Sequence, residues 1–444
     1  MSQSVEAGPV SGNVSPLQLG VDRIQARRAI EALRAGVPNR DAVRLLSSQQ
    51  PQVEARFRRQ LGALAEDAAA GRPTPGLLIA GDFGSGKSHL LEYLEHVALD
   101  EHMVCSRVVI SKETPLHDPA RVLRAAVASQ VVPGKRGSAL VELASSLDAD
   151  SPEYAALTHW VSRPDVGLSS RFAASLFLYQ QVKDPEIRDR IVSLWAGDPL
   201  NVSQMRSWLG ALGERSTYRL ESAPARELVL QRLLFLARVI LAAGYAGWVI
   251  LFDEVELIGR YSFKQRARSY AELARWAGKL KTGGVPGVAA TFAITTDFDA
   301  AVLQDRGDLE VVPGKLRASG VDADLKLASQ AEQGMRMIAR EPLRLRGPDR
   351  AVLERTREEV RALHALAFAW EPPDLGAGEL LSTTRIRQYV RRWINEWDLK
   401  RMDPEYAPAT VVSDLPVNYS VRPDLEAPEE AVTDADESDA DSVH

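Results

Sequence analysis

The sequence predicts an α/β fold in which helices cover both faces of a mainly parallel sheet. Mainly apolar runs occupy residues 77–80, 104–110, 248–252 and 289–294, and each has the length of a buried strand. Between these runs, apolar side chains recur at the spacing of three and four residues that marks helices. Buried strands that alternate with helices are typical of parallel sheets covered on both faces.

The chain begins with a polar stretch, residues 1–20, whose composition predicts disorder. We expect a helix around Ile30 that ends before Gly36, a second, short helix through Leu46, and a third with Phe57 and Leu61 on its apolar stripe. A stretch rich in Pro and Gly at residues 71–76 then leads into the first strand.

The residues after the first strand match the phosphate-binding pattern G-x-x-x-x-G-K-[ST]. They are Gly81, Asp82, Phe83, Gly84, Ser85, Gly86, Lys87 and Ser88, followed by His89. The glycines let backbone N–H groups point at a phosphate chain, and the positive end of the next helix adds attraction. We expect Lys87 to reach the β- and γ-phosphates and the Ser88 hydroxyl to bind Mg²⁺. A histidine at position 89 is more typical of packing than of catalysis.

The region between residues 121 and 244 contains Pro and Gly at intervals and no clear strand, which predicts an inserted helical region. About 165 residues separate Lys87 from Asp253, and this length also favours an insertion. Residues 233–252 are apolar except for Arg238. Because Gly244 and Gly247 interrupt them, we expect a buried helix, a turn and a core strand, and no membrane span.

Two adjacent acids, Asp253 and Glu254, end the apolar run at residues 248–252. A nucleotide hydrolase needs a carboxylate at the C-terminal end of a strand to hold Mg²⁺, and Asp253 has that position. It also needs a group that orients or deprotonates the attacking water, for which Glu254 is the candidate. Taken alone, such a pair could be the solvated end of a strand. The phosphate-binding pattern in the same chain favours the catalytic interpretation.

The strand at residues 289–294 ends in two threonines, Thr295 and Thr296. A hydroxyl there could hydrogen-bond the γ-phosphate or the attacking water, because ligands of such sheets lie at the C-terminal ends of the strands. Threonine is also common at strand ends for reasons of packing. Both interpretations stay open, as does the choice between Thr295 and Thr296, although Thr295 is the one we assign to catalysis.

The C-terminal third is expected to contain one more strand around residues 335–338, then helices at residues 352–370 and from about 382 to 399. Arginines are the candidates for stabilising charge on the γ-phosphate in the transition state. Arg385, at the start of the last helix, could point at the nucleotide, whereas Arg306 and Arg317 could serve a neighbouring subunit. Solvated helix charge is the alternative, favoured for Arg391 and Arg392.

The composition is that of a soluble globular protein, with a net charge of −6. The last twenty residues hold eight acids and no Lys or Arg, so the acidity is concentrated in a tail and any DNA contact needs a local basic patch. Cys105 is the only cysteine, which excludes an internal disulfide and a thiolate zinc cluster. With no signal-peptide pattern at the N-terminus, we expect a cytoplasmic protein.

These residues, in this order, resemble the AAA+ and related P-loop ATPases. Walker A is Gly81–Ser88, Walker B comprises residues 248–254, a sensor-1-like strand ends at Thr295, and a sensor-2-like Arg385 begins a late helix. The chain resembles more closely the BREX-associated ATP-binding family, whose members are proteins of phage-exclusion loci. Residues 26–38, the stretch 113–119 after Walker A, and residues 363–370 add to that similarity.

The resemblance implies an AAA+-like ATPase core at residues 21–345, with the insertion at about 121–244, and a helical lid at residues 346–403. Residues 404–444 would be an irregular segment and an acidic, disordered tail. It implies ATP and Mg²⁺ as ligands, a role in defence against phage, action on DNA or on other defence-system proteins, and oligomerisation with nucleotide between subunits. Adenine preference also comes from the resemblance, because no N-K-x-D run is present.

Three functions are compatible with these features. The first is an ATP-hydrolysing motor or switch, favoured by the presence of Lys87, Asp253 and Glu254 together. The second is a nucleotide-gated regulator or scaffold that binds ATP and turns it over little. The third is a nucleotide kinase, against which the paired acids and the long C-terminal region argue. The region after residue 399 is too short and too rich in Pro for a winged-helix DNA-binding domain.

Overall fold

The structure is a computed structural model that describes residues 22–35, 48, 50–220, 225–281, 283–347, 349–375 and 386–405. The expectations for residues 1–20, for the short helix through Leu46, for Arg385 and for the tail lie outside the described residues. Contacts divide the described residues into two compact units. One unit holds residues 22–56, 81–97 and 344–405, and the other holds residues 57–80 and 98–343.

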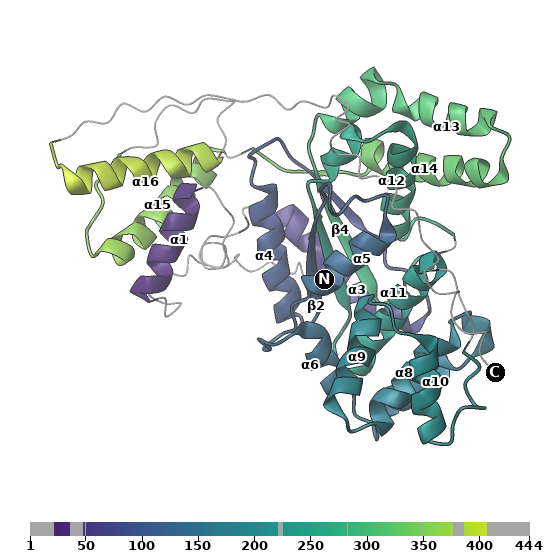
Figure 1. Cartoon of the computed structure of the whole chain (residues 1–444). Coiled ribbons are helices and arrows are strands. Elements are labelled where there is room, and N and C mark those ends of the chain that lie inside the picture. The colour runs from purple at the N-terminus through teal and green to yellow at the C-terminus, as the bar shows by residue number, and fades with distance from the viewer. Residues whose placement is uncertain are drawn as a thin grey trace, which may run out of the picture. The chain divides into compact units, whose positions relative to one another are not determined.

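The second unit is built on a sheet whose strands have the order β2-β3-β4-β1-β5 within the described residues (Figure 1). The bounds are β1 (Leu77–Ala80), β2 (Val104–Val109), β3 (Trp248–Asp253), β4 (Val288–Ile294) and the short β5 (Leu343–Arg344). The pairs β2/β3, β3/β4 and β1/β4 are parallel. The predicted parallel sheet with its four apolar strands is therefore confirmed.

The region between β2 and β3 is helical throughout its described residues, as the sequence predicts. It contains α5 (Pro119–Ala128), α6 (Ala139–Ser145), α7 (Pro152–Val161), η1 (Pro164–Val166), α8 (Ser170–Gln181), α9 (Pro185–Ala196), α10 (Val202–Ala211) and α11 (Ala225–Ala242). Several of these helices begin with a side-chain cap, such as Asp118 on the N–H groups of Ala120 and Arg121. Their apolar faces continue the core that covers one face of the sheet (Figure 1).

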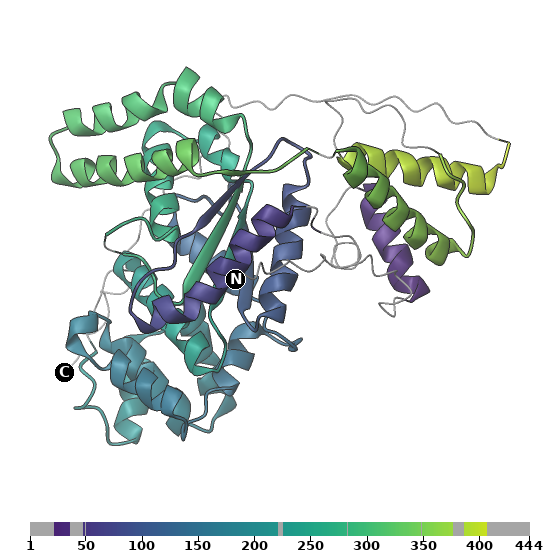
Figure 2. The same ribbon diagram turned by 180° about the vertical axis from the view of Figure 1, so that it is seen from behind.

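Helix α3 (Pro51–Ala69) lies over the opposite face of the sheet, as Figure 2 shows. The Gln60 side chain of α3 donates to the carbonyl oxygens of Pro75, at 2.9 Å, and Ala290, at 3.2 Å. The Thr291 hydroxyl on β4 donates to Oε1 of Gln60 at 3.3 Å. A buried amide with its hydrogen bonds satisfied fixes the position of a helix on a sheet more specifically than apolar contact alone.

The expected strand at residues 335–338 is wrong, because these residues belong to the helix α14 (Asp322–Arg340). Its buried side chains Ala328, Ala331, Met335 and Ile338 recur at three- and four-residue spacing, which is the period of a helix face. The alternation of Met335, Arg336 and Met337 imitates a strand over three residues only. The short strand of this region is β5, which begins three residues after the helix ends.

Helical segments follow the C-terminal ends of β3 and β4. A 3₁₀ segment (Val255–Arg260) and α12 (Phe263–Trp276) follow β3, while a π-helical turn (Asp299–Asp305) and α13 (Asp308–Ala318) follow β4. A buried network joins them, because Asp308 accepts hydrogen bonds from Nε of Arg266, at 2.8 Å, and Nη2 of Arg266, at 2.9 Å. The Tyr270 hydroxyl donates to the same carboxylate at 2.8 Å.

The first unit contains a three-helix cluster formed by α1 (Arg23–Ala35), α15 (Arg350–Phe368) and α16 (Ile386–Met402). Its apolar core includes Ile30 from α1, Leu363 from α15 and Trp397 from α16. The predicted stripe of the last helix is confirmed, since Tyr389, Val390, Trp393 and Ile394 are buried there too. The N-terminal helix thus packs with helices that follow it by more than three hundred residues.

Among the described residues, the structure has no helix of sufficient length and apolarity to cross a membrane. The apolar stretch at residues 233–252 divides into the end of α11, a turn with positive φ at Gly244 and Gly247, and the buried strand β3. This division is the one that the glycines predict.

Candidate functional site

The phosphate-binding pattern has the strand–loop–helix geometry that its function requires. Strand β1 ends at Ala80 and α4 (Lys87–Asp100) begins at Lys87, so the loop consists of residues 81–86. Gly84 has a φ of 79° and Gly86 a φ of 93°, values that residues with a side chain rarely adopt. The loop is thereby able to turn sharply and to bring its N–H groups to the N-terminus of α4.

Gly81 is required for a different reason, which is lack of space. A Cβ atom on Gly81 would lie 2.5 Å from Oγ of Ser85 and 2.8 Å from Cδ1 of Leu345. Both distances are shorter than side chains tolerate. A side chain at position 81 would therefore require the Ser85 hydroxyl and the end of the Leu345 side chain to move.

Lys87 folds back over the loop that precedes it. Its Nζ donates to the carbonyl oxygens of Gly81, at 3.0 Å, and Asp82, at 3.2 Å, and the side chain is buried. The ammonium group is thus held at the loop, where it can exchange these neutral acceptors for phosphate oxygens. Burial lowers the pKa of His89 to about 4, so its imidazole is neutral at pH 7 and adds no charge for a phosphate.

The parallel register brings the strand-end residues to one edge of the sheet. Ala80 on β1 pairs with Ile294 on β4, and Phe252, just before Asp253, pairs with Phe292. Strand β4 separates β1 from β3, so the ends of these two strands are about 10 Å apart at the usual spacing between strands. The loop starts directly after Ala80, and Thr295 follows Ile294 directly. These positions are the ones that the sequence predicts for a nucleotide site.

Asp253 is buried, with 3% of its surface exposed, and both of its carboxylate oxygens accept hydrogen bonds. Oδ1 accepts from the backbone N–H of Glu254 at 3.0 Å, and Oδ2 accepts from Nη2 of Arg107 on β2 at 3.0 Å. Arg107 was missed by the sequence reasoning. A charged residue inside an otherwise apolar strand was the available signal, but only the pairing of β2 with β3 shows which acid it contacts.

Glu254 has a left-handed backbone conformation, with a φ of 58°. This conformation costs a non-glycine residue roughly 1–3 kcal/mol and is typical of functional sites. It turns the chain from β3 into the 3₁₀ segment that begins at Val255. At the end of β4, Thr295 is buried and Thr296 is partly exposed. Both threonines remain candidates.

The oxygen groups of the site suit a hard divalent ion. Mg²⁺ is usually held by one or two protein oxygens, together with waters and substrate phosphates. Ser88 and Asp253 are residues of that kind. The described residues contain no group of three or more His, Cys, Asp or Glu side chains able to hold a metal by themselves. The residues therefore fit a magnesium ion that enters together with a nucleotide.

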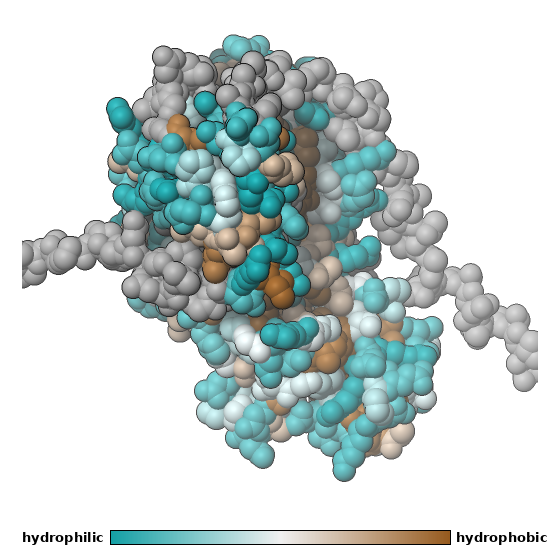
Figure 3. All heavy atoms as spheres, turned by 90° about the vertical axis from the view of Figure 1, so that its left-hand side faces the viewer, coloured by the Kyte–Doolittle hydropathy of each residue, from teal (hydrophilic) through white to brown (hydrophobic). Residues whose placement is uncertain are grey.

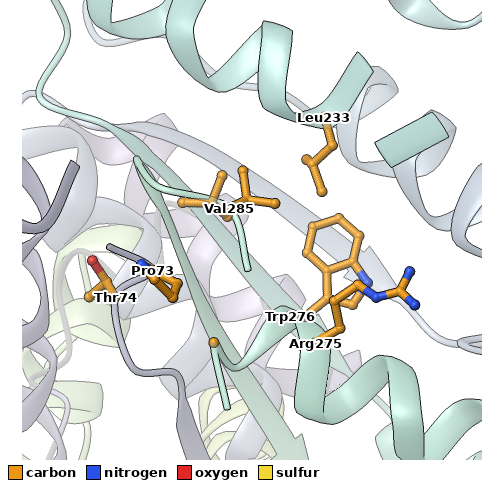
Figure 4. Close-up of a pocket in the computed structure, with 8 residues that line it drawn as sticks. Pro73, Thr74, Leu233, Arg275, Trp276 and Val285 are labelled. Carbon is orange, nitrogen blue, oxygen red and sulfur yellow. The ribbon is translucent and has the colours of Figure 1, made fainter. Parts of the chain in front are cut away.

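A small cavity lies at the other edge of the sheet (Figure 4). It is lined by Pro73 and Thr74 before β1, by Val285 before β4, and by Arg275 and Trp276 at the end of α12. Because these residues precede the strands, the cavity faces away from the edge where Ala80 and Asp253 lie. It is not part of the candidate nucleotide site.

The arginines expected to act on phosphate are not joined to this site by the structure. Arg385 lies outside the described residues. Arg317 forms an ion pair with Glu332 of α14 at 2.6 Å, and Arg306 donates to the carbonyl oxygen of Gly259. Both are held within the second unit, so their service to a neighbouring subunit stays a prediction.

The model of one protein family, described as BREX system ATP-binding protein BrxC/D, matches residues 21–144 and 220–401, which is more than half of the chain. The unmatched stretch between them contains α7, α8, α9 and α10 of the helical insertion. Comparison with curated proteins gave no match, and comparison with solved structures gave none.

Proposed function

Because the chain belongs to the BREX system ATP-binding protein BrxC/D family, we propose that it is a Mg²⁺-dependent ATPase of an AAA+-like kind. ATP hydrolysis would drive a motor or switch in defence against phage. The proposal includes an ATPase core at residues 21–345 and a helical lid at residues 346–403. ATP hydrolysis would act on DNA or on other defence-system proteins.

The observation that carries this proposal is the shared edge of the sheet. The loop after β1, the acids after β3 and the threonines after β4 all begin where parallel strands end. Ligands of open α/β sheets bind at that edge. The positive φ values of Gly84 and Gly86 support a phosphate at the loop.

Each residue then has a defined task. Lys87 binds the β- and γ-phosphates, and the Ser88 hydroxyl and Asp253 hold the ion or its waters. A bound Mg²⁺ would neutralise phosphate charge. Glu254 orients a water molecule and accepts its proton as the water oxygen bonds to the γ-phosphorus and the bond to the ADP oxygen breaks. The Thr295 hydroxyl hydrogen-bonds the γ-phosphate, and Arg385 stabilises its charge.

The second candidate is a nucleotide-gated regulator with little turnover, and one contact favours it. Asp253 is already paired with Arg107, so a divalent ion has to compete with a guanidinium group for the same oxygen. A chain that rarely releases this pair would bind ATP and hydrolyse it slowly. Both candidates use the same binding residues and differ in the rate of phosphate release.

Phosphate release separates them. We expect the wild type to release phosphate in the presence of Mg²⁺ and ATP, and Lys87→Ala to abolish ATP binding and release together. Glu254→Gln should bind ATP as tightly as the wild type while its release falls by about a hundredfold or more. The matched controls are Lys264→Ala and Glu310→Gln, which change exposed side chains on α12 and α13.

A wild type that releases no more phosphate than Lys87→Ala, with or without duplex DNA, would overturn the ATPase proposal. If ATP still binds in that case, the regulator is the correct alternative. Sizing the protein with and without ATP tests the proposed oligomer, because a site between subunits should make assembly depend on the nucleotide.

A further inference from the structure

The three-helix cluster of α1, α15 and α16 is strongly basic, although the whole chain is acidic. These helices contain thirteen Arg and Lys residues against six Asp and Glu residues, a net charge of +7, while the whole chain has −6. Their charged side chains contribute to a described surface that is mainly hydrophilic (Figure 3). Such a local excess of positive charge is the pattern that attracts a polyanion.

Arginines from two helices converge at the C-terminal end of the third. Nε of Arg23 and Nε of Arg27, both on α1, donate to the carbonyl oxygen of Ala367 at 3.2 Å and 2.9 Å. On α16, the guanidinium group of Arg401 lies 4.4 Å from the ring centre of Phe368, and that of Arg27 lies 5.7 Å from the same ring. We call Arg23, Arg27 and Arg401 the arginine cluster.

The acid beside this cluster does not neutralise it. Asp398 on α16 pairs with Arg34, approaches Arg401 at 3.8 Å and accepts a hydrogen bond from Nε2 of His364 at 3.2 Å. One carboxylate is therefore shared between two guanidinium groups. All three side chains of the cluster are exposed.

The cluster is oriented before any ligand arrives. Arg23 and Arg27 use Nε to bond the end of α15, and the described hydrogen bonds leave their Nη groups for an incoming acceptor. A guanidinium group fixed through Nε and by stacking on an aromatic ring loses less conformational entropy when its Nη groups bind a phosphate. Paired Nη donors match the geometry of phosphate oxygens.

We propose that the arginine cluster on α1 and α16 binds the phosphate backbone of duplex DNA without reading its sequence. Contacts from arginine to phosphate position a protein on DNA and carry no base information. The proposal does not depend on ATP hydrolysis.

The test measures binding of the full chain to a fluorescently labelled 30-base-pair duplex of mixed sequence between 50 and 300 mM salt. We expect the triple variant Arg23→Gln, Arg27→Gln, Arg401→Gln to bind at least about tenfold more weakly at 50 mM salt. Its plot of log affinity against log salt should be shallower by about 2.7, because each phosphate contact contributes about 0.9 to that slope.

The matched control removes the same charge elsewhere, with Arg136→Gln, Arg215→Gln and Arg219→Gln, three exposed side chains of the other unit. It should bind DNA as the wild type does. Lysine at the three cluster positions should restore most of the salt slope, because it keeps the charge. It should restore only part of the affinity, because it lacks the paired donors of arginine. A purely structural role would not separate the two quantities. Thermal unfolding of all variants reports whether each one is folded, and ATP binding is measured separately.

Four outcomes would overturn the proposal. A wild type that does not bind the duplex at 50 mM salt is one, and equal binding by the cluster variant and the control is another. Binding of polyglutamate in place of DNA would assign the surface to an acidic protein. If the cluster variant loses ATP binding but keeps DNA binding, these arginines act at the nucleotide. That result would leave the proposed ATPase function intact.

Discussion

Asp308→Ala should destabilise the protein far more than an ordinary substitution, because it leaves a buried cation without its partner. Asp308 is fully buried, and its carboxylate accepts two hydrogen bonds from Arg266 and one from Tyr270. Arg266 is 7% exposed. Burial by itself lowers the pKa of Arg266, but the hydrogen bond and charge of Asp308 outweigh it and raise the pKa.

The expected cost follows from these contacts. Removing one partner of a buried ion pair costs about 3–5 kcal/mol, because the remaining charge has neither water nor a counter-ion. For a domain of about 150–250 residues each kcal/mol corresponds to about 2–4 °C in Tm, so melting of the unit that contains Asp308 should fall by up to about 6–20 °C. Scanning calorimetry or circular dichroism would measure it.

Two further variants make the reasoning refutable. Asp305→Ala removes an exposed acid three residues earlier and should change the free energy of unfolding by less than about 0.5 kcal/mol. The double variant Arg266→Met, Asp308→Leu replaces the pair with apolar groups and should recover most of the lost stability. If Asp308→Ala melts within 2 °C of Asp305→Ala, roughly the scatter for an exposed substitution, the network does not stabilise this unit and the argument is wrong.

The remaining predictions concern the nucleotide site and the three-helix cluster. Gly81→Ala should weaken ATP binding in a fluorescent-nucleotide titration, because its Cβ would lie 2.5 Å from Oγ of Ser85 and that hydroxyl would have to turn away; unchanged affinity would show that the loop adjusts there without cost. Arg107→Met should tighten binding of Mn²⁺ with ATP about fivefold in calorimetry, since a partly exposed ion pair contributes about 1 kcal/mol, and unchanged affinity would show that the two cations do not compete. Burial raises the pKa of Asp398, but the hydrogen bond from His364 and the charge of Arg34 outweigh it and leave the pKa lowered. Its contribution to stability is therefore complete above the ordinary pKa of an aspartate, about 3.9, and is lost as the pH falls through the lowered value. Melting of wild type and Asp398→Asn between pH 6 and pH 3 should converge at the acidic end, and parallel curves would contradict this assignment.

Much of the fold and of the site could be predicted from the sequence because it depends on local patterns. The strands at 77–80 and 248–253 are short apolar runs, and the loop at 81–88 needs glycines at fixed offsets from a lysine. The helical insertion was also visible, because Pro and Gly mark the ends of helices whatever lies around them. The expected strand around Met335 failed where three alternating residues outweighed a longer helical period.

The sequence by itself determined that a phosphate loop, an acidic strand end and a threonine strand end exist, since each is encoded within a few neighbouring residues. Only the tertiary structure decided that β4 lies between β1 and β3, that Arg107 holds Asp253, and that α1 packs with α15 and α16. The physical reason is that strand order, ion pairs between strands and helix packing depend on contacts between residues more than a hundred positions apart. No local pattern in one sequence specifies which of many apolar faces and charged groups will meet.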